Sequence, residues 1–152
     1  MTNLSQLPSG NTKRFIAILN KKIELGRLMN ALGHMSAGLV ALIEQKEGNN
    51  IKDLCFLEYK DADSSIHPCI SHYPFIVLKA DNSNKIRTVR SKAIEMQLPF
   101  TDFVDSMIVG SSNAQLKATA QTTELDHEYF GICLFGETEE LKELTGKFSL
   151  FR

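Results

Sequence analysis

The sequence lacks paired cysteines, long apolar runs and any excess of charge of one sign. Its three cysteines, Cys55, Cys69 and Cys133, are widely spaced and form no CxxC pair, which argues against a disulfide framework and indicates a reducing compartment. No apolar run approaches the roughly 18 residues of a membrane helix, and the polar N-terminus has no signal-peptide core. We therefore expect a cytoplasmic protein that is neither secreted nor inserted in a membrane.

Charge and size set further bounds. The 152 residues include 17 basic and 18 acidic side chains, a formal net charge of −1, and 43% of them are hydrophobic. This composition is typical of one soluble domain with a genuine core. A near-neutral chain has no overall field to attract RNA phosphates, so nucleic-acid binding would need a local basic patch.

The standard catalytic motifs are also missing. There is no GxGxxG, P-loop, GxSxG or HExxH motif, which removes sequence support for the common dinucleotide, nucleotide, serine-hydrolase and metalloprotease sites. His67, Cys69 and His72 carry ligand-type side chains at close spacing, but a fourth ligand at a recognised spacing is absent. The sequence therefore predicts neither a metal nor a cofactor.

The most informative segment is residues 15–44, in which an apolar strand and a basic loop precede a helix expected over 26–45. Arg27, Asn30 and His34 recur at helical spacing and fall within about 60° of arc on one side of that helix. The other side is expected to face the core and carries Leu28, Met29, Leu32, Met35, Leu39, Leu42 and Ile43. The polar stripe is therefore a candidate functional surface.

Strands and helices alternate along the rest of the chain. This alternation predicts an α/β sheet with helices on its faces and ligand sites near the carboxyl ends of strands. Residues 1–12 are expected to form a flexible arm, and residues 13–152 a single domain. The pattern predicts strands over 15–20, 54–59, 74–80, 99–109 and 129–136, and helices over 26–45, about 84–97, 113–121 and 137–146.

Three side chains have chemistry suited to a site. His34 carries an imidazole, which can act as an acid, a base or a hydrogen-bond donor. Arg27 stays protonated, so its expected task is to hold a carboxylate, a phosphate or a developing oxyanion. Asp105 lies near the end of a predicted strand, where it either caps a turn or reaches the face of Arg27 and His34.

The order and spacing of several short motifs resemble a known family. The chain is similar to the archaeal and eukaryotic-type (type II) peptidyl-tRNA hydrolases, and more closely to a bacterial family of unknown function classed beside them, over about residues 13–152. The resemblance implies a three-layer α/β/α fold with a mixed, mostly parallel sheet, and a homodimer. The motifs are KKIELGRLMNALGHMSAGLVA, PFIVLKA, LPFTDFVDS, FGICLFG and LTGKFSLFR.

The resemblance also implies site residues. Gly26 matches a glycine of the hydrolases' glycine and lysine loop, His34 matches the histidine of their first helix, and Asp105 matches their active-site aspartate. Arg27 stands in place of their catalytic lysine, and an arginine keeps the positive charge but cannot become a base or nucleophile. The chain departs from the hydrolases at two more positions: Ala31 replaces a glutamine of their first helix, and Val109 replaces an expected threonine. The segment 110–128 is also longer than its counterpart.

Three functions stay open at this point. The first is a hydrolase of an ester or amide linked to RNA or a related substrate, in which Arg27 stabilises negative charge, His34 orients or protonates, and Asp105 positions water. The second is a module that binds a small anionic ligand through Gly26, Arg27 and Asn30 without catalysis. The third is a structural or interaction protein that packs another helix or sheet against the small residues Gly33, Ser36, Ala37 and Gly38.

Overall fold

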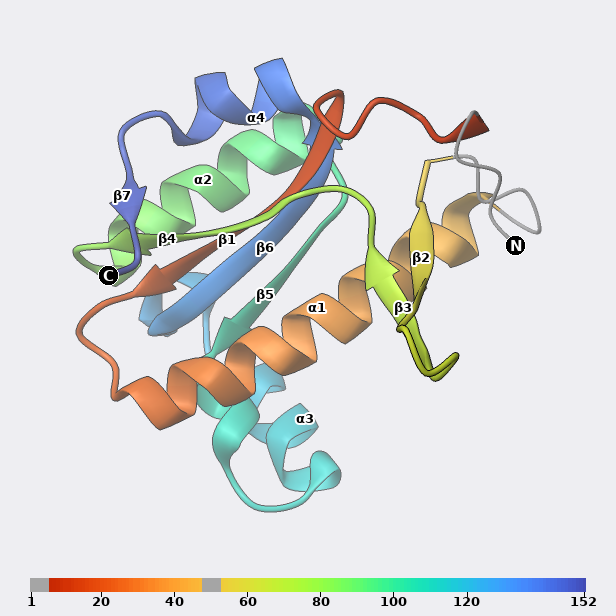
Figure 1. The fold of residues 1–152 in the computed structure, drawn as a ribbon. Helices are drawn as coiled ribbons and strands as arrows, with labels where there is room; N and C mark the ends of the chain where they lie inside the picture. The colour runs from red at the N-terminus through yellow and green to blue at the C-terminus, as the bar shows by residue number, and fades with distance from the viewer. Residues whose placement is uncertain (1–5, 48–52) are drawn as a thin grey trace.

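A computed structural model of the chain describes residues 6–47 and 53–152 (Figure 1). Its larger sheet has the strand order β5-β6-β1-β4-β7, and a separate hairpin joins β2 to β3. The elements are β1 (Lys13–Asn20), α1 (Leu25–Glu47), β2 (Phe56–Lys60), β3 (Ile66–Ser71), β4 (Phe75–Ala80), α2 (Ser83–Glu95), β5 (Phe100–Val104), η2 (Asp105–Ile108), α3 (Ser112–Ala120), η3 (Glu124–Asp126), β6 (Tyr129–Glu137), α4 (Thr138–Thr145) and β7 (Ser149–Leu150).

The predicted α/β class is confirmed, and the sheet is mixed as expected. Its parallel content is lower than predicted, because β1–β4 is the one parallel pairing in the described sheet, while β1–β6, β5–β6 and β4–β7 are antiparallel. The cause lies in the connections. Between β1 and β4 the chain crosses the face of the sheet through α1, and the two strands are therefore parallel. Between β5 and β6 the elements η2, α3 and η3 stay at the end of the sheet where β5 finishes. Strand β6 therefore runs back antiparallel to β5.

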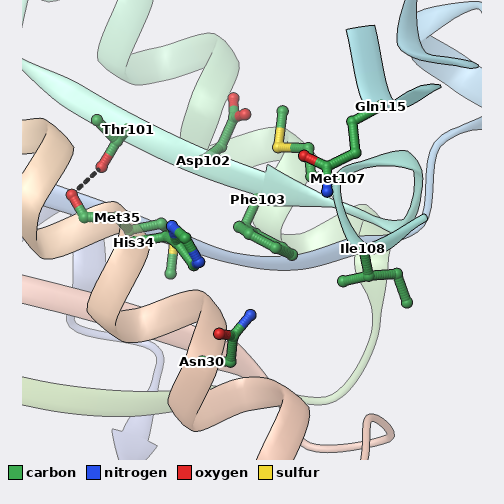
Figure 2. Close-up of a pocket in the computed structure, with 9 residues that line it drawn as sticks. All are labelled: Asn30, His34, Met35, Thr101, Asp102, Phe103, Met107, Ile108 and Gln115. Carbon is green, nitrogen blue, oxygen red and sulfur yellow. Dashed lines mark hydrogen bonds between the residues drawn. The ribbon is translucent and has the colours of Figure 1, made fainter. Parts of the chain in front are cut away.

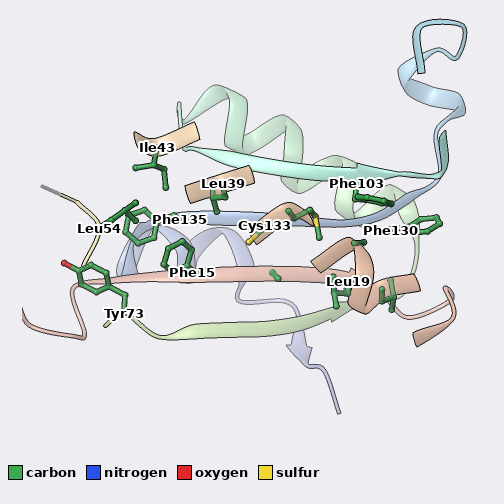
Figure 3. Close-up of a cluster of buried hydrophobic side chains, with 14 residues drawn as sticks. Phe15, Leu19, Leu39, Ile43, Leu54, Tyr73, Phe103, Phe130, Cys133 and Phe135 are labelled. Carbon is green, nitrogen blue, oxygen red and sulfur yellow. The ribbon is translucent and has the colours of Figure 1, made fainter. Parts of the chain in front are cut away.

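Helices cover both faces of the sheet, so the fold has three layers: α1, the sheet, and α2 with α4 (Figure 1). Side chains alternate along the central strand β1: Phe15, Ala17 and Leu19 pack in the cluster under α1, while Ile16 and Ile18 pack with α2 and α4. Figure 3 shows the cluster between α1 and the sheet, where the aromatic rings of β1, β5 and β6 meet the apolar side of the helix. This packing holds α1 across the sheet with its other side exposed.

Three local predictions about this fold were wrong. No strand was predicted between 54–59 and 74–80, but β3 forms there, and in it Cys69 has a positive φ of 55° beside a register shift in the hairpin. The strand predicted over 99–109 ends at Val104, because η2 begins at Asp105. Met29, predicted in the core, is 65% exposed, so the side of the helix that faces the core is narrower than predicted.

The described part of the N-terminal segment contacts the domain. The His72 Nε2 atom lies 2.7 Å from the Pro8 carbonyl oxygen, and the Thr138 hydroxyl donates to the Asn11 carbonyl at 2.7 Å. Residues 1–5 of the expected arm lie outside the described residues, so flexibility over 1–12 stays a prediction. In the described ranges, every helix is too short or too polar to cross a membrane.

Candidate functional site

A pocket of about 390 Å³ opens between the first half of α1, the end of β5 and the η2–α3 segment (Figure 2). Its walls come from segments that are far apart in the sequence, and it is the place where the polar stripe of α1 meets the rest of the fold. Its lining residues are Asn30, His34, Met35, Thr101, Asp102, Phe103, Met107, Ile108 and Gln115.

The α1 wall carries two of the predicted site residues. Asn30 and His34 lie one helical turn apart, and both are exposed at the pocket. The His34 ring lies beside the Phe103 ring, with 6.0 Å between the ring centroids (Figure 2). Among the described residues no side chain hydrogen-bonds to the His34 imidazole. Both ring nitrogens are therefore available to a ligand or a water molecule.

Strand β5 supplies the floor. The Thr101 hydroxyl donates to the Met35 carbonyl of α1 at 2.8 Å, which ties the strand to the helix at the pocket (Figure 2). Asp102 points to the opposite side of the strand, where its carboxylate accepts from the Arg90 Nε at 2.8 Å. The charge of Asp102 is thus compensated from outside the pocket, while Phe103 presents an apolar surface inside it.

The roof is formed by η2 and α3. Met107 and Ile108 come from η2, and Gln115 comes from α3, which buries none of its residues. The Ser106 and Thr119 hydroxyls lie 2.6 Å apart and join the two short helices. The roof is therefore formed by two short helices tied to each other, and it places the Gln115 amide across the pocket from α1.

Gly26 and Arg27 do not line the pocket. Their backbone N–H groups donate to the Glu24 carboxylate, at 2.9 Å from Gly26 and 3.3 Å from Arg27. This acid side chain satisfies the free donors of the first helical turn, which is the position that an incoming anion would need. The Arg27 side chain is exposed at the start of α1, one turn before Asn30.

Asp105 also lies outside the pocket lining. Its carboxylate accepts a hydrogen bond from His127 Nδ1 at 3.3 Å and another from the Glu128 backbone N–H at 3.2 Å. Its own N–H donates to the Glu128 carbonyl at 3.0 Å. These bonds join the start of η2 to the start of β6, so the structure brings Asn30 and His34 together but does not place Asp105 with them.

The three ligand-type residues of the β2–β3 region are separated by the fold. His67 pairs with Asp61, Nε2 to Oδ2 at 3.2 Å, whereas His72 contacts Pro8 and Cys69 is exposed. Hydrogen bonds from the Ser65 backbone and from His67 hold the pKa of Asp61 below its usual value. In the described parts of the chain no group of three or more acidic, His or Cys side chains is arranged to hold a metal ion.

The arrangement is suited to binding a polar molecule over an apolar floor. It offers two primary amides and an imidazole, with the apolar side chains of Met107 and Ile108 beside them. Five lining residues were not singled out from the sequence: Thr101, Phe103, Met107, Ile108 and Gln115. Of these, only Gln115 lies in the segment 110–128, whose extra length was noted in the sequence; the other four carried no comparable signal.

Comparisons with known proteins agree on the family and the fold. The sequence profile described as "Protein of unknown function (DUF2000)" matches residues 13–152. A solved structure of a protein of unknown function from Agrobacterium tumefaciens strain C58 superposes with a TM-score of 0.75 and 15% identity, covering 93% of this chain and 98% of that one. No functionally curated protein matches the chain. Neither match points to a peptidyl-tRNA hydrolase relationship.

Proposed function

This chain belongs to the DUF2000 family of proteins of unknown function, and we propose that it binds a small uncharged polar molecule in the pocket beside His34. One observation carries the proposal. The His34 imidazole and the Asn30 amide lie one helical turn apart on α1, and both line that pocket. The pocket's volume, about 390 Å³, is within the range of small-ligand sites.

The lining chemistry favours a neutral ligand. Asn30 on α1 and Gln115 on α3 each offer a donor and an acceptor, and His34 adds one of each in its neutral form. The one charged lining residue, Asp102, is already paired with Arg90. A small molecule that carries amide-type groups, such as a nucleobase or a carboxamide, can form hydrogen bonds with these three side chains.

Charge also favours a neutral ligand over the anionic alternative. An anion bound through Gly26, Arg27 and Asn30 would compete with the Glu24 carboxylate for the helix donors. Negative charges brought this close repel each other, so that ligand would have to displace Glu24. We therefore place a neutral ligand ahead of an anionic one.

The test is an NMR titration of the full chain with adenine, uracil and nicotinamide as probes. We expect at least one probe to shift the side-chain amide signals of Asn30 and Gln115 in a saturable way, and Asn30→Ala or His34→Ala to weaken binding about tenfold. Asn113→Ala removes an exposed α3 amide outside the lining, and His67→Ala removes a remote imidazole, so both controls should bind normally. Equal losses in the controls, or no saturable shift with any probe, would refute the proposal.

A hydrolase acting on an ester or amide linked to RNA is the second candidate. The free imidazole of His34 favours it, because such a group can act as a general acid or base. In this candidate Arg27 stabilises negative charge and Asp105 positions water, although Asp105 would act from outside the pocket lining. tRNA would then be a partner, and its binding should weaken steeply with added salt.

The assay for this second candidate is release of peptide from peptidyl-tRNA. Activity that His34→Ala removes and His67→Ala keeps would support it. If neither the natural chain nor its Arg27→Lys variant releases peptide, the hydrolase candidate is rejected, while the NMR titration still decides on the neutral ligand.

A further inference from the structure

The exposed side of α1 has an unusual charge distribution for a surface helix. From Leu28 to Ile43 the helix carries no Asp, Glu, Lys or Arg, although Asn30, Gly33, Ala37 and Ala41 on its outward side are exposed. A solvated helix face normally carries charged side chains. We call this surface, with Arg27 at its start and Glu44 at its end, the α1 outer face.

No contact in the described structure accounts for Gly33 on this surface. A Cβ on Gly33 would meet no heavy atom within 4 Å, so no neighbouring segment in the described structure requires its absence. Gly33 also has an ordinary helical φ, since the positive-φ glycine of the described residues is Gly110. Glycine within a helix is unfavourable relative to alanine, and here its small size leaves the helix backbone accessible to another molecule.

Charges and small residues on the α1 outer face are arranged symmetrically in the sequence. The midpoint between Met35 and Ser36 is equally far from Arg27 and Glu44. The same midpoint relates Gly33 to Gly38, His34 to Ala37, and Asn30 to Ala41. A second helix laid antiparallel across this point would therefore place small residues against small or polar ones, and Arg27 near a glutamate.

We propose that the α1 outer face is a self-association surface that pairs antiparallel with α1 of a second copy of this chain. A two-fold axis through the midpoint brings Arg27 of each copy to Glu44 of the other, and neither side chain has an ion-pair partner among the described residues of its own chain. Antiparallel helices also align their dipoles favourably, and the small residues let the backbones approach closely.

The proposed surface adjoins the pocket without depending on the proposed ligand. His34 lies at the border of both, and in the pair it would face Ala37 of the second copy. The second copy would thus form part of the pocket mouth. Self-association is measured on the free chain, so its failure would leave the NMR result on the pocket untouched.

The test is charge reversal followed by sedimentation equilibrium of the full chain. We expect the natural chain to dimerise, Arg27→Glu and Glu44→Arg each to weaken the dimer about tenfold or more, and the double variant to recover most of the loss, as charge complementarity requires. Matched controls on the opposite face of the sheet are Lys92→Glu and Glu95→Arg of α2, which should leave association unchanged.

A bulky substitution supplies a second, charge-independent measurement. Gly33→Leu has open space in the monomer and should keep the circular dichroism spectrum while it weakens association about tenfold. Ser91→Leu on the exposed side of α2 is its control. A natural chain that stays monomeric to about 100 μM overturns the proposal. A double reversal that associates no better than either single reversal overturns it too.

Discussion

The Asp105 carboxylate accepts a hydrogen bond from the Nδ1 atom of the buried His127 side chain at 3.3 Å. This bond joins the beginning of η2 to the residue that precedes β6 by two positions, and it thereby closes the base of the η2–α3 roof. It also directs Asp105 to His127 while His34 has no carboxylate partner among the described residues. The aspartate that the sequence suggested for catalysis thus acts in this structure as a connection between two segments.

Replacing Asp105 should therefore affect stability more than ligand binding. In Asp105→Ala, His127 and the Glu128 N–H lose their acceptor, and we expect the free energy of unfolding to fall by about 1–2 kcal/mol. Urea unfolding measures this change, and His34→Ala, which removes no hydrogen bond to another described side chain, should leave stability nearly unchanged. A larger effect of Asp105→Ala on probe binding than on stability would contradict this role.

Replacing Gly131 and Gly33 by alanine should change the free energy of unfolding in opposite directions. A Cβ on Gly131 of β6 would lie 2.8 Å from Leu19 Cδ2, 2.9 Å from Met35 Cε and 3.0 Å from the Ile18 carbonyl oxygen. We expect Gly131→Ala to lower the free energy of unfolding by about 1–3 kcal/mol, because the packed core has no room to move. Gly33→Ala, with open space around it, should raise it by about 0.5–1 kcal/mol. Chemical denaturation at one low protein concentration compares the two, and equal effects would contradict the packing described for β6.

Stability should decline at acid pH in part through Asp81. Hydrogen bonds from Lys21 and Lys85 lower its pKa from 3.8 to about 2. Because the folded pKa lies below the unfolded one, Asp81 contributes stability above about pH 4, and this contribution disappears as the pH falls from about 4 towards 2. We expect Asp81→Asn to be less stable than the natural chain at pH 6, with the difference shrinking as the pH approaches 2.5. A difference that stays constant over that range would contradict the assignment.

Two of the cysteines, Cys69 and Cys133, should differ in reactivity. Burial raises the pKa of the Cys133 thiol to about 12, whereas Cys69 is exposed on β3. A thiol reagent at pH 8 should therefore modify Cys69 quickly in the folded protein and Cys133 only after unfolding, since the thiolate is the reactive form. Mass spectrometry of the labelled peptides identifies the sites. Rapid labelling of Cys133 under native conditions would show that its part of the core opens easily.

Much of the fold followed from local pattern. Continuous apolar runs identified β1, β4 and β6, and the sequence also predicted α2, at whose start the Asn82 side chain accepts the Lys85 N–H. The pairing direction of the strands did not follow, because it depends on which end of the sheet each connection occupies. The hairpin strand β3 was missed for a different reason: its exposed sequence contains Pro68 and has no alternation of apolar and polar residues.

For the candidate site, the sequence predicted which residues of α1 lie together but not what they meet in the fold. Helical spacing put Asn30 and His34 on one side of α1, and this depends only on 3.6 residues per turn, so the sequence by itself determined it. Sequence alone could not show that the same side meets Phe103, Ile108 and Gln115, or that Asp105 turns to His127. Those pocket contacts join residues that are at least 69 positions apart, as from His34 to Phe103, and the Asp105–His127 pair is 22 positions apart. They are decided by sheet order and by the path of residues 105–128, which arise only when the whole core packs.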